Sequence, residues 1–405
     1  NGTRNDTHHL VRDVIVAHSG QSGNDNFEIG YSANNVRVYL DTGTGSQDAQ
    51  TQYDVPGGIS NGVPHHVAIV YNGPGNNARD ITKTYFDGKL IGLDNRWRGP
   101  TDNAGGNAEL TLGLARPDRA DPWGDFDGVI DDVQFHDNAI RSSQVNAHFS
   151  GKALPIAALS YNASTDDNNG IWEEEVQALE TGNRDYALTG QPLVNAGGNG
   201  NLGITSAYRF NGNGPVTTGD ANPEGFGSNV TDNSASFEIW FKPTDLMGQE
   251  VVWEWGGNTD GASLTLDDTM LRLRAKDNAN IGDAFADITG VQGMVHAVGV
   301  IDLDNDLLSL FINGQLIDSD PYNGNDWAGS NVLGLGGQNG QLGGNLSGYG
   351  AFFGDIAIHR FYAEALNRQE VLALYAENAH IPEPATLALL GLGATGLLGR
   401  RRREA

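Results

Sequence analysis

The chain contains two copies of one sequence pattern, and this repeat limits the possible folds more than any other feature. Residues 84–94 (TYFDGKLIGLD) match residues 310–320 (LFINGQLIDSD), and residues 126–149 match residues 352–375. The matched blocks keep their order along the chain, so they indicate a duplicated domain. The distance between the copies is far longer than the roughly 20–50 residues of a solenoid repeat. We therefore expect two globular units of the same kind.

Each copy has the pattern of an antiparallel β-structure. Asn313-Gly314 stands between two apolar runs, and Asp87-Gly88 holds the same place in the first copy. Such pairs favour a tight hairpin, because both central residues of a type I′ turn need a positive φ. Short apolar runs alternate with turn residues along the chain, which contains 56 glycines among 405 residues. This spacing favours an antiparallel β-sandwich over alternating strands and helices.

Each copy also ends in a predicted short helix. In the second copy Asn367 has the N-cap position, and Glu370 follows three residues later, as in a capping box. Val371, Leu374 and Tyr375 then form an apolar stripe at helical spacing. We expect this helix to lie against the sandwich.

Four short motifs of the first copy carry a family resemblance. They are a His-Val-Ala strand (66–68), a Phe-Asp-Gly hairpin (86–88), a Leu-x-Leu-Gly strand (110–113) and a Gly-x-Ile-Asp-Asp-Val strand (128–133). With their partners in the second copy, they resemble the laminin-G-like, concanavalin-A-like jelly roll. The resemblance implies an all-β chain made of two antiparallel β-sandwiches. We expect one sandwich in residues 1–150, a second one in residues 151–379 and a separate tail in residues 380–405.

The two copies differ at their front ends. In the second copy, residues 207–212 and 236–243 resemble the first two core strands of the family. The alternation in the second of these strands predicts one buried and one wetter face: Phe237, Ile239 and Phe241 against Glu238, Trp240 and Lys242. The first copy has no counterpart of these strands before residues 14–17, which match residues 251–254. We therefore expect the first sandwich to be N-terminally truncated in this chain, and the second to be complete.

The tail differs in composition from the rest of the chain. It has three parts in order: Pro382, Glu383 and Pro384, then the uncharged run 385–399, then Arg400, Arg401, Arg402 and Arg403. An apolar segment followed by a basic cluster obeys the positive-inside rule, although the run is shorter than the ~20 residues that span a bilayer comfortably. The tail resembles a PEP-CTERM sorting signal.

That resemblance implies an exported bacterial protein. A short transmembrane-like helix would anchor the chain transiently in the membrane. An exosortase-type membrane protease would then cleave near the Pro-Glu-Pro and pass the protein to the cell surface or an extracellular polysaccharide matrix. The first residue is Asn1 and not Met, so the lack of a signal peptide is no argument for a cytoplasmic protein.

Composition excludes several functions. With 24 Lys and Arg against 51 Asp and Glu, the net charge is −27, which is unfavourable for binding nucleic acid because phosphates need a basic surface. The chain has no cysteine, so thiol nucleophiles, thiolate metal sites and disulfides are excluded.

The same fold includes laminarinase-type hydrolases, whose acidic residues alternate along one strand so that the carboxylates meet in a groove. No such strand is found, because the acidic residues 173–175 are consecutive. We therefore expect a non-catalytic surface or matrix protein that binds glycans or matrix partners. The alternative is a divergent carbohydrate-active enzyme on the same fold.

Two tryptophans are candidates for ligand binding. Trp97 and Trp327 fall in the corresponding long loop of each copy. Exposed tryptophans in loops can stack on sugar rings, and this fold often binds glycans. The alternative is that each indole packs its own loop onto the sandwich.

Two pairs of aspartates are candidates for calcium, which prefers several hard oxygen ligands. Asp131 and Asp132 lie in a predicted strand, where Asp131 would share a face with Val133 and Phe135 and so be partly buried. Its partner would be Ca²⁺, a backbone N–H or an arginine. Asp166 and Asp167 form an acidic loop before the core strands of the second copy. The alternative for this second pair is an Asx turn without a metal.

Overall fold

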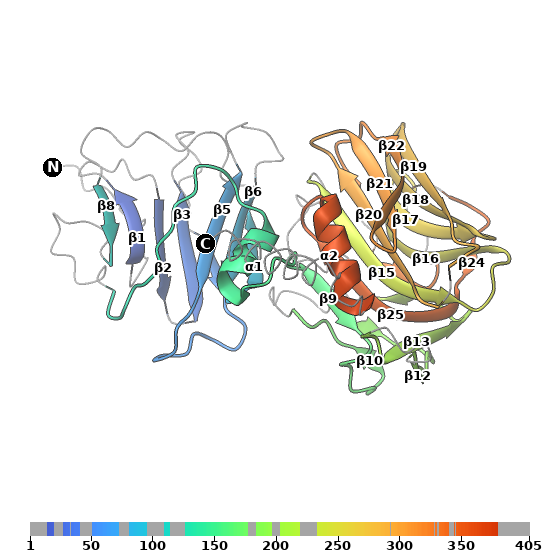
Figure 1. Ribbon diagram of the computed structural model, residues 1–405, viewed down its shortest axis with the longest axis horizontal. Helices are drawn as coiled ribbons and strands as arrows, with labels where there is room; N and C mark the ends of the chain where they lie inside the picture. Colours follow the sequence, from blue (N-terminus) through green and yellow to red (C-terminus); the bar gives the residue numbers. More distant parts are fainter. Residues whose placement is uncertain are drawn as a thin grey trace, which may run out of the picture.

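The structure is a computed structural model, and its two halves lie side by side along the long axis of the molecule (Figure 1). It describes residues 14–19, 27–32, 34–40, 51–72, 81–94, 109–113, 126–176, 184–196, 203–218, 233–291, 293–327, 329, 332–339, 344 and 346–379. Within these residues strands dominate and there are two helices, α1 (Ser142–Ser150) and α2 (Arg368–Ala379). The predicted all-β class is confirmed.

The second half is a sandwich of two large sheets. One has the order β12-β13-β25-β15-β20-β21-β22, with β9 added on β25: β9 (Leu159–Asn162), β12 (Leu193–Asn195), β13 (Ser206–Asn211), β15 (Ala235–Pro243), β20 (Val295–Asp302), β21 (Leu307–Ile312), β22 (Gln315–Pro321) and β25 (Phe353–Tyr362). The other has the order β14-β23-β16-β17-β18-β19, with β24 added on β16: β14 (Val216–Thr217), β16 (Gln249–Gly256), β17 (Asp260–Asp267), β18 (Met270–Asp277), β19 (Asn280–Asp287), β23 (Gly334–Leu335) and β24 (Gly350–Ala351). A separate two-stranded sheet joins β10 (Ile171–Trp172) to β11 (Tyr186–Ala187).

Aromatic residues fill the space between these two sheets. Phe237 of β15 stacks on Trp253 of β16, with ring centroids 4.3 Å apart, and both rings are fully buried. Burying an aromatic ring removes a large apolar area from water, so such pairs dominate the stability of a sandwich.

The first half has the same plan with fewer strands. A five-stranded sheet has the order β4-β3-β2-β1-β8: β1 (Val14–Ser19), β2 (Phe27–Ser32), β3 (Asn35–Leu40), β4 (Thr51–Asp54) and β8 (Glu109–Leu112). A three-stranded sheet has the order β5-β6-β7: β5 (Val67–Asn72), β6 (Ile81–Phe86) and β7 (Lys89–Asp94). Val38 and Leu40 of the first sheet pack with Phe86 and Ile91 of the second in one buried cluster.

The local signals in the sequence produce the predicted turns and helix cap. Asn313 and Gly314 have φ values of 50° and 77°, and Asp87 and Gly88 have 47° and 72°, as type I′ hairpins require.

At the start of α2, Asn367 Oδ1 accepts the backbone N–H of Glu370 at 3.1 Å, and the Glu370 carboxylate accepts the Asn367 N–H at 2.9 Å. The predicted capping box is therefore confirmed.

One predicted strand is absent. Residues 126–140, which include the counterpart of β25 at 127–136, contain no strand, and Phe135 is 56% exposed whereas its counterpart Phe361 is buried. In the second half β25 is held by ladders to β13, β15 and β9. The described part of the first half has no counterpart of β13 or β15. An extended segment without a ladder partner leaves its backbone groups to water, so it does not become a strand.

The predicted wet face of β15 is wrong for two of its three residues. Glu238 and Trp240 are as fully buried as Phe237 and Ile239, whereas Lys242 is exposed as predicted. The reason is α2, which lies across the outer face of this sheet (Figure 1) and stacks Tyr375 on Trp240 with ring centroids 5.7 Å apart. A strand covered on both faces loses the alternation of exposure that an uncovered sheet has.

Polar contacts join the two halves next to the helices. Arg141, at the start of α1, places Nε 2.7 Å from Glu370 Oε1 and Nη2 2.6 Å from Glu370 Oε2. Ser143 Oγ donates to the same carboxylate at 2.6 Å. From β6, Lys83 Nζ donates to the Ala363 carbonyl at 2.7 Å. Hydrogen bonds and an ion pair thus connect the first turn of α1 to the first turn of α2.

The predicted transmembrane-like helix of the tail lies outside the described residues. Among the residues that are described, no helix is both long enough and apolar enough to cross a membrane.

Candidate binding site at the junction of the two halves

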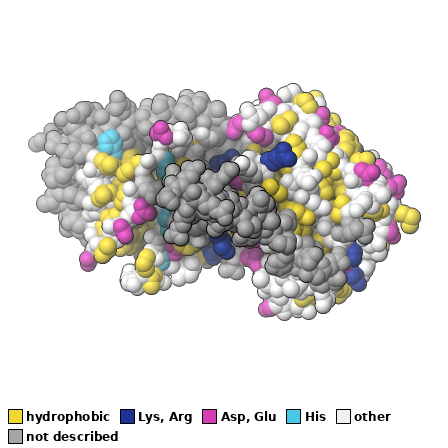
Figure 2. All heavy atoms as spheres, in the orientation of Figure 1, with side chains coloured by type: hydrophobic (Ala, Val, Ile, Leu, Met, Phe, Trp, Pro, Cys, Tyr) yellow, Lys and Arg dark blue, Asp and Glu magenta, His cyan; other side chains and the backbone are white. Residues whose placement is uncertain are grey.

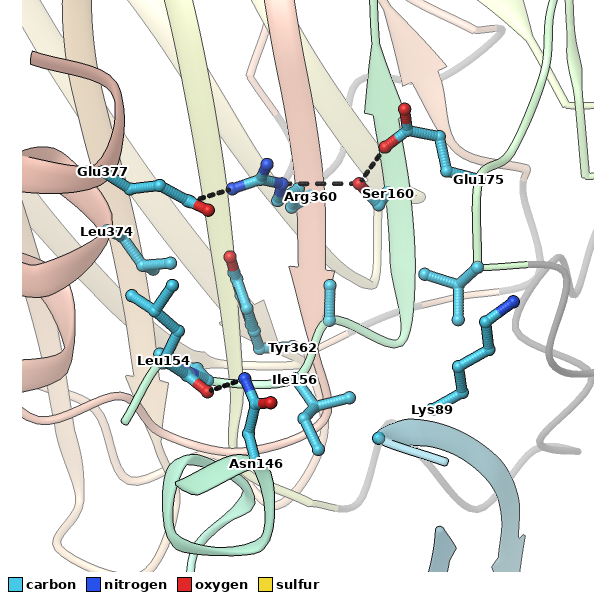
Figure 3. A pocket seen from close by; sticks show the side chains of 14 residues that line it. Lys89, Asn146, Leu154, Ile156, Ser160, Glu175, Arg360, Tyr362, Leu374 and Glu377 are labelled. Atoms are coloured by element: carbon cyan, nitrogen blue, oxygen red, sulfur yellow. Dashed lines mark hydrogen bonds and ion pairs between the residues drawn. The ribbon is translucent and has the colours of Figure 1, made fainter. Parts of the chain in front are cut away.

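A pocket of about 280 Å³ opens where the two halves meet (Figure 3). Its walls come from β9, β25 and α2 of the second half, from α1 and the β6–β7 hairpin of the first, and from the connecting residues 154–157. Apolar side chains of Leu154, Ile156 and Leu374 line part of the wall. A pocket with apolar walls and a few polar groups is the usual form of a small-ligand site.

A line of polar groups crosses the pocket. Arg360 lies between α2 and β9, with Nη1 3.3 Å from Glu377 Oε2 and Nε 3.4 Å from Ser160 Oγ (Figure 3). The Ser160 hydroxyl donates to Glu175 Oε2 at 2.9 Å. Lys89, which belongs to the first half, lines the side of the pocket opposite Glu377 (Figure 3). The pocket therefore offers carboxylate, hydroxyl, guanidinium and ammonium groups within one small space.

A buried carboxylate behind the pocket holds Arg360 in place. Glu238 is 0% exposed, and its oxygens accept from Tyr362 Oη at 2.6 Å and Trp240 Nε1 at 3.0 Å. His296 Nε2 lies 3.2 Å from Glu238 Oε1, and Arg360 Nη1 lies 3.4 Å from Oε2. Burial by itself would raise the pKa of Glu238, but the Arg360 charge and the hydrogen bonds from His296 and Tyr362 outweigh it and lower the pKa to about 2.

The sequence pattern does not single out Glu238, because strand alternation places it on the predicted wet face of β15. One sequence feature does indicate that Glu238 is buried: it stands between Phe237 and Ile239, in a strand that also carries Trp240. Charged residues are almost never fully buried unless they are paired. Three of its four partners, Tyr362, His296 and Arg360, come from β20 and β25, far along the chain.

The acidic loop of the second half brings three carboxylates together. Asp166, Asp167 and Glu173 each place one oxygen within 4.8 Å of the others. Burial, together with repulsion from Asp166, raises the pKa of Glu173. An all-oxygen set of this kind suits a hard cation such as Ca²⁺.

The loop is also organised without a cation. The backbone N–H of Asn168 donates to Asp166 Oδ1 at 2.9 Å, and that of Asn169 donates to Asp167 Oδ1 at 3.1 Å. Tyr208 donates its hydroxyl to Asp166 as well. The Asx turns that the sequence offered as the alternative are thus present.

The two candidate tryptophans for ligand binding are Trp97 and Trp327. Trp97 lies outside the described residues. Trp327 is 0% exposed and donates its indole N–H to the Asn233 carbonyl at 2.7 Å, so the prediction that it stacks on a sugar is wrong. Its ring packs against Phe237 and Trp255, because the long loop folds back into the space between the sheets.

Asp131 and Asp132 are both exposed, so the prediction of a partly buried Asp131 is wrong. Asp131 Oδ1 accepts the backbone N–H of Asp132 at 2.9 Å, and Asp132 has a φ of 49°. The partner of Asp131 is thus a local backbone group. Among the described residues no strand pairs with this segment, and both carboxylates are left in water.

The chain matches two family models. The description "Concanavalin A-like lectin/glucanases superfamily", for a laminin-G-type domain, applies to residues 4–146 and 210–372. The PEP-CTERM protein-sorting motif matches residues 380–403, which include Pro382–Pro384 and Arg400–Arg403. This motif indicates export to the surface of a bacterial cell and implies processing by an exosortase. Among curated proteins, none matches the chain.

Solved structures with a similar chain path include carbohydrate- and receptor-binding domains. The CBM40 domain of the Ruminococcus gnavus IT-sialidase, bound to α2,3-sialyllactose, is 18% identical with a TM-score of 0.31, and the match covers 38% of this chain and 89% of that one. The binding domain of Botulinum neurotoxin DC in complex with SialylT is 16% identical with a TM-score of 0.31, covering 43% and 40%. The binding domain of Paraclostridial Mosquitocidal Protein 1 is 16% identical with a TM-score of 0.36, covering 55% and 52%. The match thus spans about half or less of the two toxin chains.

The repeat, the two-sheet architecture and the two matched regions agree with one another, and the matched regions together make up most of the chain. The protein belongs to the concanavalin A-like lectin/glucanase superfamily, with two laminin-G-like regions followed by a PEP-CTERM sorting motif.

Proposed function

We propose that the protein is a non-catalytic surface or matrix protein that binds glycans in the pocket between its two halves. The observation that carries this proposal is the mixed lining of the pocket. Glu175 and Glu377 offer acceptor oxygens, whereas Lys89 offers ammonium donors and Asn146 has a second amide N–H beside the one that donates to the Leu154 carbonyl. Sugar hydroxyls both donate and accept hydrogen bonds, so they can use both kinds of group at once.

Charge favours a neutral glycan as the ligand. The chain carries a net charge of −27, and acidic side chains are spread over both halves on the face drawn in Figure 2. A field of this sign repels an approaching polyanion. Inside the pocket the two carboxylates are matched by Arg360 and Lys89, so the repulsion comes from the molecule as a whole.

The buried carboxylate next to the pocket is not a candidate catalytic acid. A typical glycosidase needs one carboxylic acid that stays protonated near neutral pH beside a second carboxylate. Glu238, with a pKa of about 2, stays ionised and is fully enclosed, so it serves as a structural counter-ion.

In this proposal residues 1–150 and 151–379 are two domains of one binding unit. Residues 380–405 are the sorting signal, which anchors the chain in the membrane until an exosortase cleaves near Pro384. The released protein then remains at the cell surface or in the extracellular polysaccharide.

A glycan array of neutral and acidic oligosaccharides, with and without calcium, tests the proposal. We expect binding to neutral glycans, and at least a tenfold loss of affinity in Glu175→Gln and Asn146→Ala. Asp267→Asn, an exposed change at the end of β17, is the matched control and should bind as the wild type does. Binding that is equal in all four proteins would rule out the pocket, and no glycan binding at all would overturn the function.

A further inference from the structure

The two sheets of the second half meet at one edge, where aspartates of β22 contact the backbone of β19 (Figure 1). Each of these strands is the last of its sheet, and among the described residues neither has a strand paired with its outer side. Instead, the backbone N–H of Asp283 donates to Asp320 Oδ2 at 2.9 Å, and that of Phe285 donates to Asp318 Oδ2 at 2.9 Å. Every second residue of an edge strand directs its N–H away from the ladder. Two carboxylates therefore occupy donors that a further strand would use.

A β-bulge brings these two carboxylates to the inner side of β22. The pairing of β21 with β22 leaves out Ile317, which is 50% exposed. Beyond the bulge Asp318 stands opposite Leu310. Asp320 stands opposite Leu308, and both leucines are fully buried core residues. Because directly opposite residues of an antiparallel pair project to the same face, the aspartates lie on the core side of the sheet edge, where they reach β19.

The first half has a related contact at the corresponding corner. Asp94 is the counterpart of Asp320 in the repeat. Its Oδ2 lies 3.3 Å from Thr51 Oγ1 and 3.5 Å from Tyr53 Oη, and both of these side chains belong to the edge strand β4. The Tyr53 ring also covers Gly92, where an added Cβ would lie 2.4 Å from the ring. An acidic residue at this position of the repeat therefore contacts the last strand of the other sheet in both halves.

The capped strand carries exposed apolar side chains. Ile281 and Phe285 of β19 are 45% and 41% exposed. A long edge strand with exposed apolar residues is a site of edge-to-edge association unless charged groups or a covering segment block it. The same strand of a second copy is a self-complementary partner, because two identical edges pair antiparallel about a two-fold axis and the assembly closes as a dimer.

We propose that Asp318 and Asp320 form a cap on β19 that prevents two copies of the chain from joining edge to edge through this strand. Without the cap, the N–H groups of Asp283 and Phe285 pair with carbonyl groups of β19 in a second copy. The cap lies on the side of the sandwich formed by β19 and β22. It is separate from the glycan pocket and does not depend on its function.

Hydrogen exchange of the full chain, resolved to single residues by mass spectrometry at low protein concentration, tests the cap itself. Asp318→Ala should speed exchange of the Phe285 amide at least tenfold and leave that of Asp283 unchanged. Asp320→Ala should have the reverse effect, so each variant contains its own control. The cap is overturned if neither amide responds, or if each variant speeds exchange equally along the whole of β19.

Sedimentation velocity over a range of protein concentrations tests the effect on association. Asp318→Ala with Asp320→Ala should self-associate at least tenfold more tightly than the wild type, and exchange in β19 should slow again as the dimer forms. Adding Ile281→Lys, which places a charge on the exposed edge, should reverse this association. Asp131→Ala with Asp132→Ala removes the same charge from exposed positions of the first half and should behave as the wild type does. The proposal is overturned if the double variant does not associate more tightly, if the control associates equally, or if the added lysine has no effect.

Discussion

At the scale of single residues, one buried ion organises the second half. Glu238 receives hydrogen bonds or ion pairs from Tyr362, Trp240, His296 and Arg360. These partners lie on β15, β20 and β25, so one carboxylate ties three neighbouring strands together beneath α2. Removing one member of such a cluster leaves a buried charge without compensation.

Replacing Glu238 is therefore expected to destabilise the folded protein. Glu238→Gln should lower the free energy of unfolding by about 3–5 kcal/mol, because Arg360 would keep its charge without the buried counter-ion. Glu377→Gln is the matched control, since Glu377 pairs with the same guanidinium but is 39% exposed, and it should cost less than about 1 kcal/mol. Denaturant unfolding measures both values, and equal losses would contradict the assigned role of Glu238.

A second carboxylate, Glu250 of β16, gives a prediction about pH. Burial, with repulsion from Asp245, raises its pKa to about 7, and the backbone N–H of Phe353 lies 3.3 Å from its Oε2. Because the pKa is higher in the folded state than in the unfolded state, the folded state binds the proton more tightly. Protonation of Glu250 therefore stabilises the fold increasingly as the pH falls from about 7 towards 4.5, the pKa of this group in the unfolded state. This stabilisation is lost above pH 7.

Glu250→Gln should remove this pH dependence. The variant is expected to have a higher melting temperature than the wild type at pH 8, and the difference should shrink or reverse at pH 5. Thermal unfolding at the two pH values, followed by circular dichroism, measures the effect. A difference that is the same at both values would show that Glu250 does not titrate in this range.

The acidic loop gives a prediction about calcium. If Asp166, Asp167 and Glu173 hold a cation, calorimetric titration should show saturable calcium binding at about 0.15 M salt, where diffuse surface charge is largely screened. Asp167→Asn with Glu173→Gln should abolish the saturable part, while Asp166 keeps its hydrogen bond to Tyr208. Asp267→Asn with Asp268→Asn is the control. Titration curves that are alike in all three proteins would exclude the site.

At the scale of elements, the same sequence pattern has two outcomes. Residues 353–362 form β25, whereas the matching residues 127–136 form no strand. Asp131 and Asp132 stand where β25 has Ala357 and Ile358, and aspartate is unfavourable in a strand. β25 also has ladder partners on both sides and residues 127–136 have none among the described residues, so pairing decides the structure of this segment together with its own sequence.

The contact between α1 and α2 also acts at this scale. Arg141→Ala should lower the free energy of unfolding by roughly 1.5–3 kcal/mol, because it removes two charge-assisted hydrogen bonds to Glu370. It should also loosen the two halves, seen as faster proteolysis near residues 151–156 and a larger radius of gyration. Arg209→Ala is the control: Arg209 makes the same double contact with Asp355 but within one half, so it should leave the radius unchanged.

At the scale of the whole molecule, the tail has the clearest expected fate. The sorting motif covers residues 380–403, and it is the only part of the chain with four consecutive arginines. In cells with an exosortase, intact-mass measurement of the surface protein should give a chain that ends near Pro384. Surface protein that still carries Arg400–Arg403 would contradict the proposed processing, and cells without the protease should retain the full mass.

The sequence by itself determined the features that depend on neighbouring residues. The Asp-Gly and Asn-Gly hairpins, the capping box of Asn367 and Glu370, and the order of the sorting signal are local patterns of nearby positions. The repeat needs only a comparison of one part of the sequence with another. They sufficed for the fold class and family. They also placed Asp166 and Asp167 in one loop, although Glu173 joined them only in three dimensions.

Only the tertiary structure decided which side chains are buried and which strands are paired. Trp327 became a core residue because its loop folds between the sheets, and Glu238 became a buried ion because α2 covers its face. Asp131 stayed in water because no strand pairs with its segment. In each case the deciding contact comes from a part of the chain that is distant in sequence or has no described counterpart. Burial and pairing depend on such non-local partners, so local periodicity could not predict them.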